Sequence, residues 1–358
     1  MLTALYIILA ILIFGFLIFI HELGHFLTAK LCGIQVNEFS INMGPKLFGW
    51  RRGETDYSFR LIPIGGYCAM EGEDGESENP RAFTSAKWWK RLIVLCAGSF
   101  MNLLTGFIVM TLLFGIGGYT MQTTRITEIS PASALAEQGI QAGDELWSID
   151  GRRLFMRRDL DLLEGRYNAS DCELTILRNG EKHTFSHFKM EKREFEDADG
   201  SKAMRYGIVL GEYLEPGFAT VNRFASYECR DFARMVWYGL QDLFSGRAGL
   251  KDVGGAVQVV DVMVQGGKES RTVSEGVRYV LYLGAFIAVN LAVMNMLPIP
   301  ALDGGRVLFL LIGTAYTAIT KKKINPKYEA WINGAAMILL LGLMAVLLVK
   351  DVVTIASR

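Results

Sequence analysis

The chain has few cysteines and no net charge, and each of these two features excludes some classes of function. Its five cysteines are scattered over 358 residues without a C-x-x-C pair, so neither a disulfide framework nor a thiolate zinc site is indicated. Lys plus Arg and Asp plus Glu number 37 each, which leaves no excess positive charge for a nucleic-acid partner. We therefore expect no nucleic-acid binding and treat single cysteines as small apolar fillers.

Hydrophobic residues are abundant, at 51%, while charged residues still make up 21%. This mixture predicts membrane helices combined with a modest soluble domain. Each of four uncharged stretches reaches the roughly 20 residues that cross a bilayer. These stretches are Met1–Ile20, Leu92–Thr124, Tyr279–Leu302 and Ala330–Val349. A fifth, shorter run, Val307–Thr320, is expected to continue the third span past a break at Pro298 and Pro300.

Lys and Arg are concentrated between spans one and two and between spans three and four, and none precedes Lys30. The positive-inside rule then places both short loops in the cytoplasm and both termini outside. The chain is thus expected to be a multi-pass cell-membrane protein in contact with the lipid bilayer. The long segment between spans two and three is expected to lie outside the cell.

The most informative motif is His21-Glu22-Leu23-Gly24-His25, at the end of the first apolar stretch. H-E-x-x-H on a helix puts both imidazoles on one face, where they can hold one Zn²⁺ while the Glu acts as general base. The same pattern also arises by chance in long chains. In hydrocarbon, however, a Glu and two His are costly and usually mark function. We therefore predict a hydrolytic zinc site with His21 and His25 as ligands, Glu22 as base, and a substrate within the membrane.

A catalytic zinc needs a third protein ligand and one open position. The third span ends in Asn295-Met-Leu-Pro-Ile-Pro-Ala-Leu-Asp303-Gly-Gly, where prolines and glycines break the helix. An Asp at membrane depth needs a cationic partner, so Asp303 is the candidate ligand. The alternative is an Asp that ends a helix at the membrane surface.

Two segments between the spans show strand-like patterns. Residues Glu38–Tyr67 alternate in polarity between Gly-containing turns, which predicts β-hairpins beside the active site or a plain cytoplasmic hairpin. Residues Arg125–Lys189 predict a small β-rich domain in which Gly139–Gly151 resembles the PDZ pattern, with a generic β-domain as the alternative. The pair His183 and His187 lies in an alternating segment and is interpreted as strand residues.

Together, H-E-L-G-H, N-x-x-P-x-P-x-L-D-G and the PDZ-like segment resemble the site-two protease family, in particular the bacterial regulator of sigma-E protease branch with a single PDZ domain. The resemblance implies intramembrane cleavage of single-span proteins such as anti-sigma factors or remnant signal peptides. It implies Zn²⁺ bound by His21, His25 and Asp303, with Glu22 as base. It also implies substrate binding by Asn295. Gly98-Ser-Phe-Met-Asn102 resembles the second-span motif more loosely, because Ser99 replaces a proline, and makes Asn102 a further substrate-binding candidate.

The expected architecture is a polytopic α-helical membrane protein with about four spans, a membrane-associated β-hairpin region and an inserted extracytoplasmic PDZ domain. Its parts are expected to be residues 1–124 (spans one and two), 125–190 (PDZ domain), 191–278 (linker) and 279–358 (spans three and four). Within the linker, Val221–Phe244 predicts an amphipathic helix.

Two functions of other classes remain open from the residues alone. A membrane PDZ scaffold with a structural metal would need a fourth ligand, and no Cys or His is placed to supply it. A zinc transporter would show polar residues in several spans or an internal repeat. Partners are otherwise expected to be single-span substrates and possible peptide ligands of the PDZ domain.

Overall fold

The computed structural model describes residues 2–73, 75, 77–196, 200–249, 252–322 and 325–356. Met1 of the expected first span and Lys323 of the basic loop lie outside this range. The elements follow in the order α1 (Leu2–Leu31), β1 (Val36–Arg52), β2 (Thr55–Met70), a 3-10 helix (Phe83–Ser85), α2 (Trp88–Gly115), β3 (Ile126–Ile129), α3 (Ala134–Glu137), β4 (Glu145–Ile149), β5 (Arg152–Arg153), α4 (Arg158–Leu163), β6 (Cys172–Arg178), β7 (Glu181–Phe188), β8 (Arg193–Glu196), β9 (Lys202–Arg205), β10 (Ile208–Leu210), α5 (Phe218–Phe244), α6 (Ala256–Glu269), α7 (Val273–Asn295), α8 (Asp303–Thr320) and α9 (Pro326–Ala356). The chain divides into two compact units, residues 1–109 with 232–358, and residues 110–231.

Four of the described helices are long and apolar enough to cross a membrane, namely α1, α2, α7 and the Tyr328–Thr354 part of α9. This confirms the expected polytopic membrane protein. Two expected span ends were too late. Helix α2 ends at Gly115 instead of Thr124, because a Gly-rich uncharged segment follows that need not stay helical. Helix α7 ends at Asn295, earlier than the expected Leu302, and α8 begins at Asp303 after the expected break at Pro298 and Pro300.

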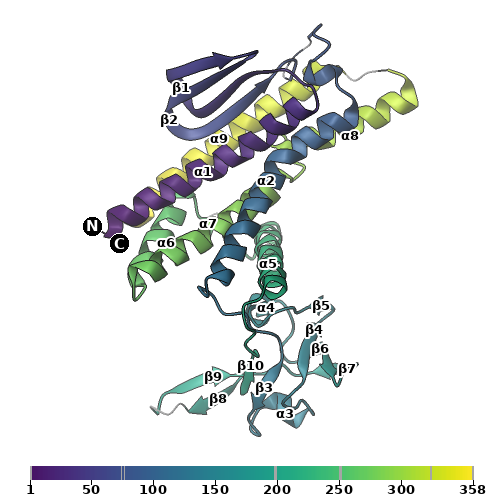
Figure 1. Ribbon diagram of the computed structural model, residues 1–358. Helices are drawn as coiled ribbons and strands as arrows, with labels where there is room; N and C mark the ends of the chain where they lie inside the picture. Colours follow the sequence, from purple (N-terminus) through teal and green to yellow (C-terminus); the bar gives the residue numbers. More distant parts are fainter. Residues whose placement is uncertain are drawn as a thin grey trace. The chain divides into compact units, whose positions relative to one another are not determined.

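In the first unit, β1 and β2 are long strands that bend back on each other beside α1 (Figure 1). Glu38 faces both Asp56 and Ala69, and Ser40 faces both Ser58 and Tyr67. The first half of β1 therefore lies between the two halves of β2, and residues 66–70 form an edge strand. The expected hairpin over Glu38–Tyr67 is present, with irregular register at the bends.

Apolar contacts hold this first unit together. One buried cluster joins α1, β1, α2 and α8 and includes Phe39, Val94 and Leu310. A second joins α1, α6 and α7 and includes Tyr6 and Val280. Because both clusters contain residues of α1, this helix is fixed along much of its length.

The second unit contains a four-stranded sheet in the order β5-β4-β6-β7, a β10-β3 pair and a β8-β9 hairpin. The β-rich pattern predicted for Arg125–Lys189 is confirmed by β3, β4, β6 and β7. Ser133 caps α3 by accepting a hydrogen bond from the Leu135 N–H. His183 and His187 lie in β7, as predicted. The β-rich part nevertheless continues past the expected boundary at residue 190, because β10 supplies the strand that pairs with β3.

Helix α5 confirms the predicted amphipathic segment and begins slightly earlier than residue 221. Its buried residues recur every three or four positions, which gives one apolar face. They include Val221, Ala225, Cys229, Phe232 and Val236.

Candidate metal centre

Two histidines of α1 and one aspartate of α8 converge on one point in the first unit. The Nε2 atoms of His21 and His25 are 3.2 Å apart. Asp303 Oδ2 lies 3.2 Å from His21 Nε2 and 3.4 Å from His25 Nε2. The structure thus brings together all three residues that the sequence predicted as ligands, across 282 positions of chain.

The size of this triangle fits a tetrahedral zinc ion. Ligand atoms about 2.0–2.1 Å from a tetrahedral Zn²⁺ lie about 3.3 Å from one another. Asp303 Oδ2 is buried and, within the described residues, has no hydrogen-bond partner of normal geometry. A cation is the group that would satisfy it. Within the described part of the chain no further His, Cys, Asp or Glu joins the group, which leaves the fourth position open.

The two imidazoles owe their placement to the helix period and to a contact with α2. Residues four apart lie one turn apart on the same face of α1. His25 Nδ1 donates a hydrogen bond to the Val94 carbonyl at 2.8 Å. With its proton on Nδ1, a neutral His25 keeps the Nε2 lone pair for a metal. Donation of the other ring N–H in this way is the usual arrangement around metal-bound histidine.

Asp303 reaches the site because the chain turns sharply between α7 and α8. Ala301 adopts a left-handed conformation with φ 72°, and its N–H donates a hydrogen bond to the Asn333 side chain. At Gly305 an added Cβ would lie 2.3 Å from the Ile299 carbonyl oxygen, so the turn requires glycine there. In the first turn of α8, Arg306 pairs with Glu73. The turn is thus fixed on both sides of Asp303.

Glu22 lies between the two histidines and is half-buried. The edge strand of β2 passes close to it, since a Cβ added at Gly66 would lie 3.3 Å from Glu22 Cγ. The Cys68 main-chain amide of the same strand lies near the Glu22 carboxylate. Glu22 is therefore held beside the metal-binding group without belonging to it.

The two predicted substrate residues lie in different surroundings. Asn295 is the last residue of α7 and half-buried, at the start of the turn that leads to Asp303. Asn102 lies on α2, is 1% exposed, and its Nδ2 is 3.4 Å from His21 Nδ1.

The sequence did not reveal three supporting features of this site. The Val94 carbonyl and the Cys68 N–H are main-chain groups, which no side-chain pattern identifies. Gly98 belongs to the second-span motif quoted above, but only the structure shows why a glycine is needed at this position. A Cβ there would lie 2.4 Å from His25 Nε2 and 2.6 Å from His21 Cε1. The glycine leaves the space that the imidazoles occupy.

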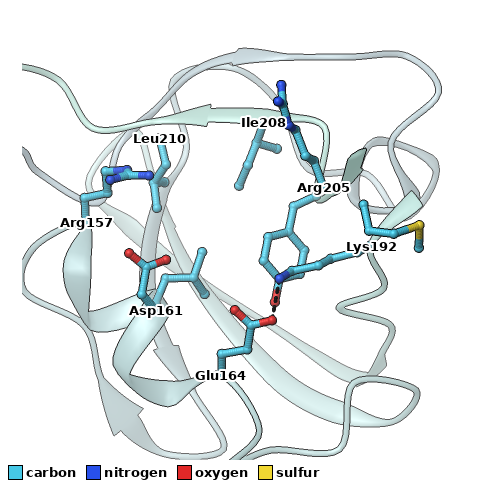
Figure 2. A pocket seen from close by; sticks show the side chains of 10 residues that line it. Arg157, Asp161, Glu164, Lys192, Arg205, Ile208 and Leu210 are labelled. Carbon is cyan, nitrogen blue, oxygen red and sulfur yellow. Dashed lines mark hydrogen bonds and ion pairs between the residues drawn. The ribbon is translucent and has the colours of Figure 1, made fainter. Parts of the chain in front are cut away.

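The second unit contains a pocket of about 310 Å³, lined by residues of α4, β9 and β10 (Figure 2). Ile208 and Leu210 of β10 give it an apolar side, and Lys192 and Glu164 form an ion pair at its rim. No His or Cys is among its lining residues. The pocket therefore lacks the histidine ligands of the metal centre.

A charged cluster joins α4 to α5 within the second unit. Arg230 Nη2 donates to both oxygens of Asp159, at 3.0 and 3.1 Å, and to Asp231 Oδ1 at 2.7 Å. Asp159 is fully buried and Asp231 is 5% exposed. Burial, together with the neighbouring Asp159 carboxylate, raises the pKa of Asp231 to about 8.

Comparison with known proteins identifies the family of this chain. A protein of Clostridium perfringens, provisionally named a zinc metalloprotease, is 35% identical over 349 residues, which cover 97% of this chain and 98% of the relative. The zinc metalloprotease RasP of Bacillus licheniformis is 27% identical over 96% of this chain and 97% of its own length. The regulator of sigma-W protease RasP of Bacillus subtilis is 26% identical over the same shares. The family profile described as peptidase family M50 matches residues 9–343, and the chain therefore belongs to this family of site-two proteases.

Proposed function

We propose that this protein is an intramembrane zinc metalloprotease that hydrolyses peptide bonds within the transmembrane segments of single-span proteins. The observation that carries the proposal is the three-residue cluster of His21, His25 and Asp303 with Glu22 beside it, at the end of an apolar helix long enough to span a bilayer. Structural zinc sites use four protein ligands, whereas a catalytic site keeps one position open. The cluster of three thus favours the enzyme over the scaffold.

His21, His25 and Asp303 would hold the zinc, which when bound acidifies water and polarises a carbonyl. Glu22 would take a proton from the attacking water onto its carboxylate and then return it to the leaving amine. The edge strand at Gly66 lies against the Glu22 side chain and would limit its movement. The apolar residues of α1 around the site would restrict the entry of bulk water.

A helical substrate hides its amides and must unwind before attack, and the unwound strand then needs hydrogen-bonding partners. The edge strand at residues 66–70 pairs with β1 on one side only and passes Glu22. We propose that the unwound substrate pairs with this edge. Asn295, at the start of the turn to Asp303, would bind a substrate main-chain group.

The β-rich unit is proposed to be an extracytoplasmic PDZ domain, with the active site near the cytoplasmic face. Strand β10 pairs with β3 on one edge, and the pocket lies between β10 and α4. An extended peptide could add to β10 and place side chains in this pocket. The name of the Bacillus subtilis relative refers to a sigma factor. We accordingly propose anti-sigma factors or remnant signal peptides as substrates.

The direct test uses purified protein with a model single-span substrate, with and without a metal chelator. Cleavage should stop with chelator and return when Zn²⁺ is added back. Glu22→Gln should remove cleavage while zinc stays bound. Cleavage by the Glu22→Gln variant at the wild-type rate would contradict the proposal.

A separate test concerns the PDZ domain. We favour a size filter over recruitment, since a peptide bound outside the membrane cannot position a bond roughly 20–30 Å away along a helix. Deletion of residues 125–210 should then permit cleavage of a substrate that still carries its folded outer domain. Continued refusal of that substrate, with slower cleavage of a trimmed one, would support recruitment instead.

A further inference from the structure

We propose that Asn102 is a positioning residue that holds the His21 ring with its Nε2 atom toward the metal, and that it does not contact substrate. The inference rests on the proposed metal centre. It follows from the contacts of one face of α2.

The Asn102 side chain has one atom near His21 and one atom without a partner. Its Nδ2 lies 3.4 Å from His21 Nδ1. Its Oδ1 is buried and, among the described residues, has no hydrogen-bond partner. Rotation of the amide by 180° exchanges these two atoms without moving the rest of the side chain. Oδ1 then faces His21 Nδ1 and accepts its proton, while Nδ2 takes the position at which Oδ1 has no partner.

The position of the His21 proton decides which nitrogen can bind metal. A neutral imidazole has one N–H and one lone pair. With the proton on Nδ1 facing Asn102, the lone pair is on Nε2, the atom 3.2 Å from both His25 Nε2 and Asp303 Oδ2. Asn102 therefore selects the tautomer that the three-ligand site needs.

Helix α2 places one polar group beside the Nδ1 atom of each histidine. The Val94 carbonyl accepts from His25 Nδ1, and Asn102 occupies the corresponding place for His21. Between them, Gly98 leaves room for both rings. Val94, Gly98 and Asn102 are spaced four residues apart, so they form one stripe along α2. This stripe faces the metal-binding group.

Burial argues against a substrate contact. Asn102 is 1% exposed, and its amide is directed at His21. A peptide could reach that amide only by displacing the imidazole that binds the metal.

The experiment uses purified full-length variants. Asn102→Leu keeps the approximate volume and removes the acceptor, Asn102→Asp keeps an acceptor, and Asn102→Ala serves as a second deletion if the Leu variant folds poorly. Thr105→Val is the matched control, because its hydroxyl donates to the Met101 carbonyl of its own helix. The zinc dissociation constant is measured by competition with a chromophoric chelator, and kcat and KM are measured at saturating zinc.

We expect Asn102→Leu and Asn102→Ala to raise the zinc dissociation constant about 10–100-fold with little change in KM. Asn102→Asp should stay within a few-fold of wild type, and Thr105→Val should match wild type. Unchanged zinc affinity together with a raised KM would overturn the proposal and make Asn102 a substrate residue. Equal losses in Asn102→Asp and Asn102→Leu would also overturn it. Full zinc binding by His21→Ala would instead disprove the proposed metal centre.

Discussion

Replacement of Gly98 by alanine tests the metal centre with a single methyl group. The new Cβ would lie 2.4 Å from His25 Nε2 and 2.8 Å from His21 Nδ1, whereas real Cβ contacts essentially never fall below 3.0 Å. An ordinary van der Waals contact begins near 3.4 Å, so the His25 ring must move by about 1 Å or α2 must withdraw. Metal–ligand distances tolerate only about 0.2 Å of error. A misplacement of about 1 Å can cost about 100-fold in rate.

We therefore expect Gly98→Ala to bind zinc at least about tenfold more weakly and to lose most of its activity. If no clash occurred, alanine would stabilise the interior of α2 by roughly 0.5–1 kcal/mol relative to glycine. A destabilised Gly98→Ala variant would therefore indicate the clash. Gly115→Ala, on the same helix, is the control, because a Cβ at Gly115 meets nothing within 4 Å. Zinc affinity is measured by chelator competition and activity with a single-span substrate. Wild-type zinc affinity and wild-type activity in Gly98→Ala would refute the role given to the stripe of Val94, Gly98 and Asn102 on α2.

The remaining predictions concern ligand roles, pH and topology. His21→Ala and Asp303→Ala should lose zinc, whereas Glu22→Gln should keep it and lose about 10²–10⁴-fold in rate; metal analysis of the purified variants decides, and full occupancy in Asp303→Ala would remove that residue from the site. Because the folded-state pKa of Asp231 is about 8 and its ordinary value is 3.8, this group's contribution to stability should be fully present below about pH 4 and be lost as pH rises to about 8. The thermal unfolding midpoint should therefore drop between about pH 4 and pH 8 in wild type and drop less in Asp231→Asn; equal drops would contradict this. A reporter active only in the cytoplasm should work when fused near Lys322 and fail near Asn179, and the reverse would invert the topology.

The candidate site could be predicted from the sequence because its key residues lie in short motifs with a fixed chemical meaning. A helix turn relates His21 to His25 without any knowledge of tertiary structure. Asp303 could be named because a carboxylate at membrane depth needs a cation. The role of Asn102 could not be predicted, because several neighbours could satisfy an intramembrane amide and only the packing of α2 against α1 selects one of them.

The elements of the fold were predictable where the local pattern is strong. The strands at 145 and 172 and the helix up to Phe244 follow from alternation and helical period. The ends of spans two and three were wrong, because an uncharged stretch indicates what could lie in a membrane and not where the helix stops. Strand β10 was missed because three residues carry little periodicity, and only pairing with β3 identifies them.

The distance along the chain between His21 and Asp303 has a consequence for biosynthesis. His21 is made near the beginning of the chain, while Asp303 follows 282 residues later. At roughly 5–20 residues per second, translation between them takes on the order of 15–60 s. During that interval the nascent chain carries only two of the three residues of the proposed zinc site. The proposed site can form only after α8 has been synthesised and has packed into the same apolar cluster as α1, so a nascent chain that stops before Asp303 should have no protease activity.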